Sequence, residues 1–467
     1  MTYSEDPGKD KVAIVFFINT AKVLSKTNGT PETYTYPIDL KEIIQNDKTL
    51  MDEAKKLGQT VTMAVTSAVT AASLMNPNPA CLWSFINTIQ MIVFIVLATV
   101  PIPPKSKGLI ISLKNYNMFP NSFSYFMTKG KPHNFTSAYD LGYASDSVII
   151  NIGSAITAFV FFIILWVVLI FLRFLIRKGC CTKKWYVDLI AELIADYKYG
   201  FFIRYGITNY LEFEVAALIG IINWRSVTEY SIANTVLSSV ILFLIPLTPI
   251  LCFVMVMKRK KKTDSGQEEF DSMYGTLFYE FNNDKGVMTS NFYVFFFAKR
   301  AIYGVILLFL RGYGVIQMTL ILIICLSFLI YLLYFRPFGE KLLNFSNIFT
   351  EIATLLIFAF IAWLLFDLSN NSRNRLDDVI YYTVYVIMGL QMGVSLALMG
   401  KSIKEKIAEW RKKKMQSKII SALSIENEEK VLNPNSNEVS RVEWVDVLKK
   451  DNSQTVGSKM FGKFFEE

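Results

Sequence analysis

The chain has 467 residues, of which 52% are hydrophobic, 14% are aromatic and only 19% are charged. A soluble domain of this length divides its apolar residues into faces, whereas here they stand in nearly uncharged runs of about twenty. This composition excludes a soluble enzyme and predicts an all-α, polytopic helical membrane protein. The net charge of +9 is clustered beside the apolar runs, which favours membrane orientation over nucleic-acid binding.

Seven apolar runs are long enough to cross a hydrocarbon layer of roughly 30 Å. They are residues 82–100, 148–176, 235–257, 292–310, 315–335, 347–366 and 379–399. Basic clusters follow both the second and the third run, yet two consecutive spans cannot both end in the cytoplasm. A further span is therefore expected between them, and only residues 206–224 have a suitable length, although they include Glu212 and Glu214.

About eight spans then place both termini in the cytoplasm. We expect a cytoplasmic segment over residues 1–81, a transmembrane domain over 82–400, and a basic helix with a flexible tail over 401–467. Loop 101–146 is predicted to be extracytoplasmic, and loop 258–291 cytoplasmic. Outer loops of this topology contain two N-glycosylation sequons, which begin at Asn134 and Asn370.

A short, strongly basic helix is predicted directly after the last span. Its cations could gather anionic lipids of the inner leaflet, each contributing about 1 kcal/mol, or could only fix the topology. They are Lys404, Lys406, Arg411, Lys412, Lys413 and Lys414. Cys180 and Cys181 follow the basic residues after the second run, where they are either a palmitoylation site or an unmodified pair.

Ionisable residues inside spans are costly in hydrocarbon and are candidates for function. Glu212 and Glu214 lie two positions apart in one helix, so they face different sides. Lys299 and Arg300 lie within the span over 292–310 or reach the inner interface by extending their long side chains. One of these cations paired with Glu351, which lies on the same inner side, would keep all three charges near the membrane.

Four uncharged amides also lie within predicted spans: Asn87, Gln90, Gln317 and Gln391. Such amides either hydrogen-bond across helices as structural contacts or line a permeation path. Enzymatic chemistry has little support, because His133 is the sole histidine and no nucleotide-binding or nucleophile motif is present. No catalytic residue, metal site or cofactor is therefore predicted, and ATP-driven transport would need a partner.

Short motifs along the chain resemble the membrane domain of the TRP-like family. The first half contributes Trp83, Asn87, Gln90, Pro101, Pro103, Pro104, Gly142, Ser145, Asp146, Asn151 and Gly153. The second contributes Lys299, Arg300, Tyr303, Gln317, residues 331–333 and 336–338, Asn347 and Glu351. That family includes fungal flavin-carrier and polycystin-like proteins and the C-terminal membrane regions of large ciliate surface proteins.

The resemblance implies an ion channel or small-solute transporter of a eukaryotic membrane, a plasma or ciliary membrane more than an internal one. It carries over no pore or substrate residue, because no selectivity-filter motif matches. The alternative is a non-conducting scaffold or accessory subunit of a larger membrane complex. A homo-oligomer and a larger complex both remain open. The family usually has an ectodomain and one more span before this region, and neither is evident in the sequence.

Overall fold

The computed structural model describes residues 40–432 apart from short gaps. The gaps are 76–79, 117–118, 127–135, 144, 179–186, 188–189, 191–192, 195–199, 201, 223–228, 263, 279 and 367. Within the described residues every regular element is a helix, which confirms the all-α prediction. By packing, the chain forms two units, Met1–Thr49 and Leu50–Glu467, and all contacts below lie within the second.

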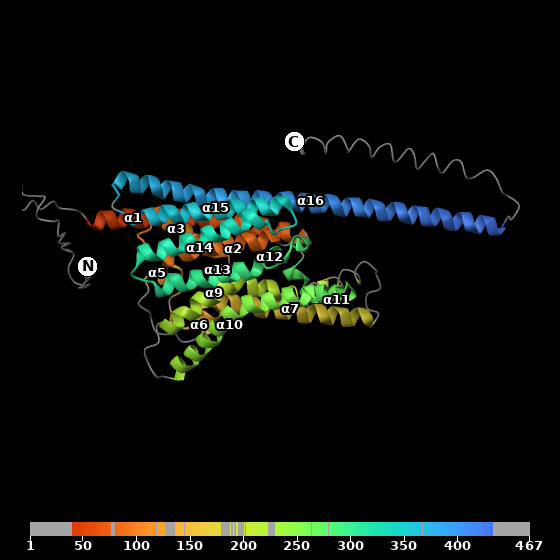
Figure 1. Cartoon of the computed structure of the whole chain (residues 1–467), viewed down its shortest axis with the longest axis horizontal. Helices are drawn as coiled ribbons and strands as arrows, with labels where there is room; N and C mark the ends of the chain where they lie inside the picture. Colours follow the sequence, from red (N-terminus) through yellow and green to blue (C-terminus); the bar gives the residue numbers. More distant parts are fainter. Residues whose placement is uncertain are drawn as a thin grey trace, which may run out of the picture. The chain divides into compact units, whose positions relative to one another are not determined.

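Within the described residues, seven helices are long and apolar enough to cross a membrane (Figure 1). They are α7 (Gly153–Arg177), α9 (Phe202–Ile222), α10 (Glu229–Lys260), α13 (Phe292–Phe309), α14 (Gly314–Phe335), α15 (Lys341–Trp363) and α16 (Asn370–Leu432). The protein is thus an integral, multi-pass membrane protein. Helix α9 covers the stretch with Glu212 and Glu214. Only the basic clusters after two consecutive apolar runs had predicted a span there.

One long helix, α1, and several short ones connect and cover these spans. They are α1 (Leu40–Met75), α2 (Ala80–Phe94), η2 (Ile95–Leu97), α3 (Pro104–Ser112), η3 (Leu113–Tyr116), α4 (Phe123–Phe126), α5 (Thr136–Asp140) and α6 (Val148–Asn151). The loop between α10 and α13 contains α11 (Asp264–Tyr274), η5 (Gly275–Leu277), η6 (Asn283–Lys285) and α12 (Val287–Ser290).

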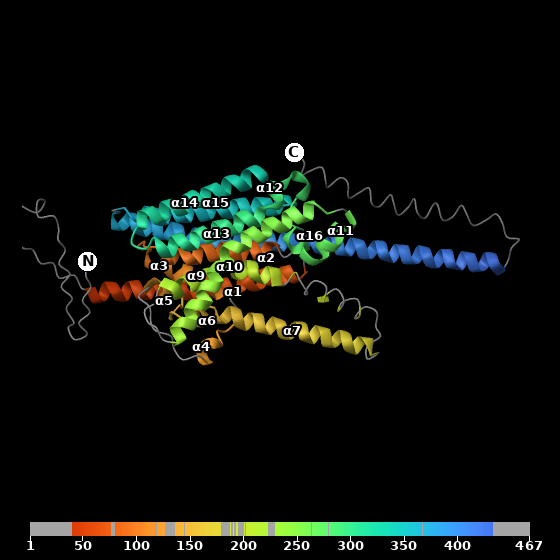
Figure 2. The same ribbon diagram turned by 60° about the horizontal axis from the view of Figure 1, so that its bottom comes forward.

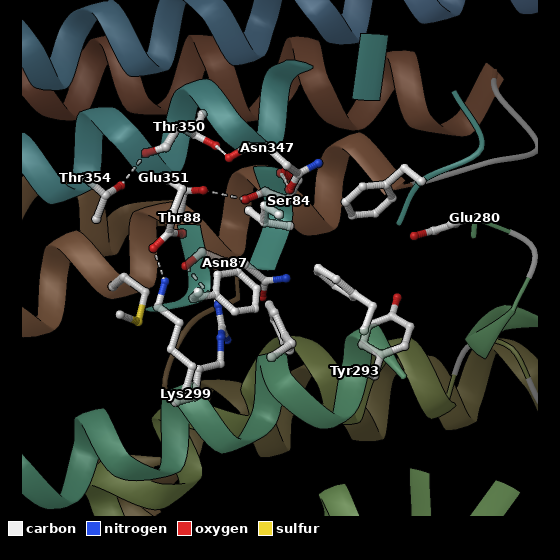
Figure 3. Close-up of a pocket in the computed structure, with 17 residues that line it drawn as sticks. Ser84, Asn87, Thr88, Glu280, Tyr293, Lys299, Asn347, Thr350, Glu351 and Thr354 are labelled. Carbon is white, nitrogen blue, oxygen red and sulfur yellow. Dashed lines mark hydrogen bonds and ion pairs between the residues drawn. The ribbon is translucent and has the colours of Figure 1, made fainter. Parts of the chain in front are cut away.

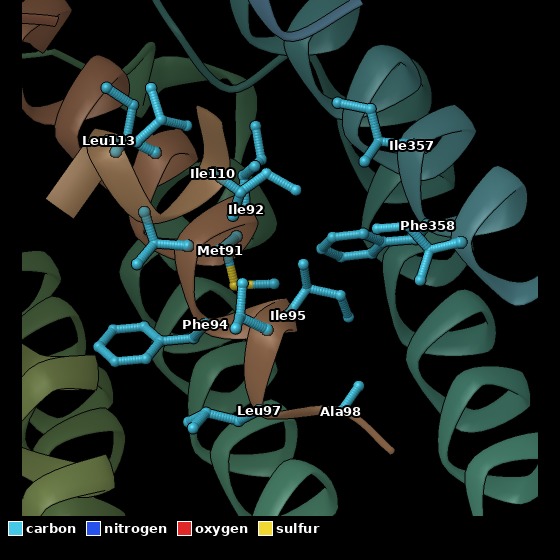
Figure 4. Packing of buried hydrophobic residues seen from close by; sticks show 14 of the residues in the cluster. Met91, Ile92, Phe94, Ile95, Leu97, Ala98, Ile110, Leu113, Ile357 and Phe358 are labelled. Atoms are coloured by element: carbon cyan, nitrogen blue, oxygen red, sulfur yellow. The ribbon is translucent and has the colours of Figure 1, made fainter. Parts of the chain in front are cut away.

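The first predicted span is a short helix that is followed by a turn back into the bundle. Helix α2 and η2 together cover the apolar stretch, and the prolines after η2 end it because they cannot donate backbone hydrogen bonds. Pro104 then begins α3, a position where its missing N–H is not needed. Figure 4 shows the result: Met91, Ile92 and Ile95 pack near Ile110 of α3, with Phe358 of α15 nearby.

Two spans are central and two are peripheral by burial, and Figure 2 shows one of the peripheral spans, α7, at the edge of the bundle. In the most apolar window of α9 and of α13, 61% of the residues are buried, against 17% in α7 and 11% in α10. Helix α13 contacts α9, α10 and α14, and α15 lies between α14 and α16. The ionisable residues of α9 and α13 therefore face protein, while α7 and most of α10 present apolar side chains outward.

Helix α1 packs with one side against α3, while its other side is exposed. Gly108 of α3 lies directly on the backbone of Met51, and Gly58 of α1 lies against Leu109 and Ser112. Ser106 of α3 donates hydrogen bonds to Asp377 in the first turns of α16. Residue 51 therefore lies at the end of the bundle where α16 begins. At 1.5 Å per residue, about 36 Å of helix then leads to Met75, which precedes α2 by four residues.

This arrangement gives α1 the length and direction of a further crossing, antiparallel to α2. The prediction that residues 1–81 are cytoplasmic would instead put Glu53 on the side of the α16 basic cluster. We expect Glu53→Cys, in a chain without its native cysteines, to react with a membrane-impermeant maleimide from the same side as Asn374→Cys, because both exposed positions lie near α3. Lys404→Cys is the control for the opposite side. Labelling of Glu53→Cys only together with Lys404→Cys would contradict the crossing.

Candidate functional site

Helix α13 positions two neighbouring cations inside the bundle. Lys299 and Arg300 are buried, and because successive residues are about 100° apart around a helix they point to different neighbours. Lys299 reaches α15, and Arg300 reaches α2. The two side chains are thus enclosed by protein and do not extend along the helix to an exposed interface.

Lys299 forms an ion pair with Glu351 of α15. The side chains are only 7% and 12% exposed, and the Lys299 ammonium also lies 4.6 Å from the ring centroid of Phe328 on α14. This is one of the two pairings that the sequence left open, and the structure forms it through Lys299. Excluding water strengthens the attraction between the two charges but also costs their hydration, so the pair joins α13 to α15 chiefly in the sense that neither charge can be left there alone.

Arg300 connects three helices. Its guanidinium donates to the side-chain oxygen of Gln90 at 3.1 Å and to the backbone carbonyl of Asn87 at 2.9 Å. Gln90 in turn donates to the carbonyl of Thr208 on α9 at 2.6 Å. The Phe296 ring lies under the guanidinium at 4.2 Å, a cation–π distance. Arg300 is therefore bound by the side chain of Gln90 and by the backbone of Asn87, whose own side-chain oxygen has no hydrogen-bond partner among the described residues. The planar, multi-donor guanidinium explains why arginine stands here.

Glu214 of α9 faces α13 at the position of a glycine. A Cβ atom added to Gly304 would lie 2.6 Å from a Glu214 carboxylate oxygen, so the close approach needs glycine. Glu214 is 1% exposed, and its two oxygens accept no hydrogen bond from any residue that the structure describes. Arg300, one turn before Gly304, supplies the positive charge that acts on this carboxylate. Glu214 thus belongs to the same layer of the membrane interior as Lys299 and Arg300.

Glu212 faces away from Glu214, as their spacing predicted. Its positive neighbour is Lys114 of η3, a residue that sequence reasoning placed in the outer loop and did not select. The Lys114 ammonium donates to the carbonyl of Leu141 and lies 3.6 Å from the Tyr143 ring centroid. Burial lowers the pKa of Lys114 to about 8, although Glu212 opposes this shift. In the sequence, Lys114 could have been identified as a partner of Glu212 only from its position as a cation directly after an apolar segment.

A polar cavity of about 60 Å³ lies between α2, α13, α14 and α15 (Figure 3). We call it the charged cavity, because Lys299, Arg300 and Glu351 line it. Its other polar lining residues are Ser84, Asn87, Thr88, Glu280, Tyr293, Asn347, Thr350 and Thr354. A buried water needs roughly 10–15 Å³ by this measure and several polar partners, so the cavity has room for a few waters or a small ion. An organic solute does not fit.

Glu280 stands at one end of the charged cavity, in the loop between α10 and α13. The Tyr293 hydroxyl donates to its carboxylate, and burial raises the pKa of Glu280 to about 7 although the nearby Arg204 opposes this. Two backbone hydrogen bonds join this loop to the turn before α15, from Asn282 to Pro337 at 2.8 Å and from Gly339 to Glu280 at 3.0 Å. The two loops thus close this end of the cavity.

The remaining predicted amides lie apart from the charged cavity. Gln317 donates to the carbonyl of Leu307 at 2.9 Å and accepts from the Thr99 backbone at 2.9 Å, so it holds the α13–α14 turn against the end of η2. Gln391 of α16 is fully buried, and in the described part of the chain both of its amide atoms lack a hydrogen-bond partner. Gln317 is a contact between helices, and Gln391 has no assigned partner.

The surface predictions are only partly covered by the described residues. Asn370 is the exposed first residue of α16, and Lys404, Arg411 and Lys412 are exposed on the extension of that helix beyond its span. Lys406, Lys413 and Lys414 belong to the same helix. Asn134, Cys180 and Cys181 lie outside the described residues. No group of three or more metal-ligating side chains is found in the described part of the chain.

No protein-family model, no curated protein and no solved structure matches this chain. The resemblance to TRP-like membrane domains therefore rests on the short motifs of the sequence alone. Several of those motif residues meet in the charged cavity or beside it, namely Asn87, Gln90, Lys299, Arg300, Asn347 and Glu351.

Proposed function

We propose that this protein moves an inorganic ion or a proton across a eukaryotic membrane, as a TRP-like ion channel or transporter whose path is closed at the charged cavity. The observation that carries the proposal is the cavity itself, in which an ion pair and an arginine surround a small polar space inside the spans. Charges are rare inside membranes because they are costly, and those that face a common space there usually belong to ion or proton pathways.

The size of the cavity narrows the transported species. A space of about 60 Å³ accepts an inorganic ion with few waters, which argues against an organic solute as long as the path is closed. Loops at Glu280 and Pro337 close one end, and the Lys299–Glu351 pair crosses the interior. Opening would therefore require that this pair separates or that the helices carrying it move apart.

A non-conducting subunit is the second candidate, and one observation favours it. The interior charges named above balance, because Lys114, Lys299 and Arg300 are matched by Glu212, Glu214 and Glu351. A balanced, enclosed set can simply hold helices together. The exposed apolar sides of α7 and α10 would then face another chain.

Flux from liposomes distinguishes the two. We expect the reconstituted protein to move at least one of K⁺, Na⁺, Ca²⁺, H⁺ or Cl⁻ faster than protein-free liposomes, and the Lys299→Gln/Glu351→Gln double variant to change that rate or its ion selectivity. The matched control is Lys401→Gln/Glu340→Gln, which neutralises an exposed pair of the same residue types. No flux of any of these ions, with folded protein in the vesicles, would contradict the proposal and favour the subunit.

A further inference from the structure

A second cavity, apolar and larger, lies on the outward side of the central spans. It has a volume of about 470 Å³ and lies between α9, α10 and Phe297 of α13, with Tyr274 and Leu277 at one end. We call it the apolar cleft. Its lining is almost entirely hydrocarbon and aromatic, and it shares no lining residue with the charged cavity.

The apolar cleft is bordered by a glycine of α9 and lies beside two prolines of α10. A Cβ atom added to Gly206 of α9 would meet nothing within 4 Å, so the cleft continues to the backbone of this helix. Pro246 and Pro249 lie within α10 beside the lining residues Ile245, Thr248 and Leu251, and each proline lacks a backbone donor. Helix α10 therefore does not fill the groove that α9 leaves.

The surroundings of the cleft identify what fills it. Helices α7 and α10 have the least buried apolar windows of the seven spans, so the cleft opens among side chains that face the bilayer. Water is excluded from apolar cavities, since it would lose its hydrogen bonds there. A void of this size in contact with lipid is instead favourable for a hydrocarbon chain, because the chain fills it and makes the dispersion contacts that an empty space would forfeit.

A cation lies near one end of the cleft. Arg204 of α9 is not a lining residue, but it follows the lining residue Ile203, and both its guanidinium and Thr276, which lies between the lining residues Tyr274 and Leu277, approach Gly200. Among the described residues its buried Nε atom has no hydrogen-bond partner. Glu280 is its electrostatic neighbour, and this is also the end at which the basic residues 258–262 follow α10. Phosphate is a ligand that arginine binds well at such a boundary between hydrocarbon and water.

We propose that the apolar cleft binds a phospholipid of the leaflet on the side of residues 258–262, with one acyl chain between α9 and α10 and its phosphate at Arg204. The acyl chain would contact Tyr210 and Phe213, and Phe213 lies between Glu212 and Glu214 in the sequence of α9. Its occupancy does not depend on the proposed ion transport, so binding is measured directly and independently of flux.

The test fills the cleft at its glycine. Gly206→Leu puts a side chain into open space, and leucine favours the helix more than glycine does, so the fold should persist. Gly389→Leu on α16 is the matched control, because a Cβ atom there also meets nothing within 4 Å. The probe is a phosphatidylserine with a diazirine on one acyl chain, photolysed in nanodiscs, with cross-linked peptides mapped by mass spectrometry.

We expect wild type and Gly389→Leu to cross-link at Leu251, Cys252 and Met255, and Gly206→Leu to do so about tenfold less. Arg204→Gln should weaken cross-linking of this lipid while a diazirine fatty alcohol, which has no phosphate, is unaffected. Equal cross-linking in wild type, Gly389→Leu and Gly206→Leu would overturn the proposal. The same would follow if Gly206→Leu lost cross-links on the outward surface of α7 as strongly as in the cleft. Cross-linking of the wild-type cleft by the fatty alcohol but not by the phospholipid would also overturn the proposal. Thermal unfolding of each variant verifies that it is folded.

Discussion

Replacing Glu351 by methionine is expected to lower the free energy of unfolding by about 3–5 kcal/mol, because Lys299 would be left as an uncompensated buried charge. Lys299→Met should cost a similar amount for the same reason. The double variant should recover most of the loss, since two apolar side chains of similar length can replace a buried pair with little change in stability. Thermal unfolding in detergent, followed by size-exclusion chromatography, measures all three.

The exposed pair Lys401–Glu340 is the matched control for this cycle. It joins the same residue types at 2.7 Å between α16 and the start of α15, but its side chains are about half exposed. Water and salt screen such a pair, so its removal should cost at most about 1 kcal/mol. If the two cycles gave equal coupling, or if Glu351→Met were as stable as wild type, the buried pair would not join α13 to α15 as the structure indicates.

Arg300→Met is expected to be at least as destabilising, with a loss of about 3–5 kcal/mol or failure to accumulate as folded protein. The change removes the donors to Gln90 and Asn87, the contact with the Phe296 ring and the positive charge beside Glu214. Several groups on α2 and α9 then lose their partner together. Methionine fills much of the volume, so the effect is chiefly electrostatic.

A second substitution tests whether the lost positive charge beside Glu214 causes the destabilisation. Glu214→Gln added to Arg300→Met should restore part of the stability, because it removes the carboxylate that has lost its cation. Arg300→Lys should lie between wild type and Arg300→Met, since lysine keeps the charge but lacks the planar head that bonds to two acceptors. Arg375→Met, at an exposed position of α16, is the control and should be near neutral. An Arg300→Met/Glu214→Gln protein no more stable than Arg300→Met would show that Glu214 does not depend on Arg300.

These expectations bear on function as well as stability. A channel or transporter must open the layer that contains Lys299, Arg300 and Glu214, so variants that keep the charge balance should remain folded while their flux changes. In a scaffold the same variants would alter stability alone. Combining the unfolding data with the liposome measurements therefore separates the two proposals for the same residues.

The sequence by itself determined the fold class and most of the spans. Uncharged runs of about twenty residues have no alternative but to become helices in hydrocarbon, because every backbone donor and acceptor must bond within its own segment. The alternation of basic loops identified α9 as well, although Glu212 and Glu214 reduce its hydropathy. Charge within the spans also singled out Lys299, Arg300 and Glu351, and it reduced the partner of Glu351 to two candidates.

Only the tertiary structure decided which helices meet and therefore which partners these charges have. Arg300 bonds to Gln90 and Asn87 from more than 200 positions away, and Lys114 reaches Glu212 because α3 folds back into the bundle. The packing of α1 on α3 was not foreseen either, since its small residues and threonines resemble a soluble helix. Hydropathy fixes how deep a residue lies in the membrane. The neighbour at that depth depends on close packing between distant segments, which a periodic pattern does not encode.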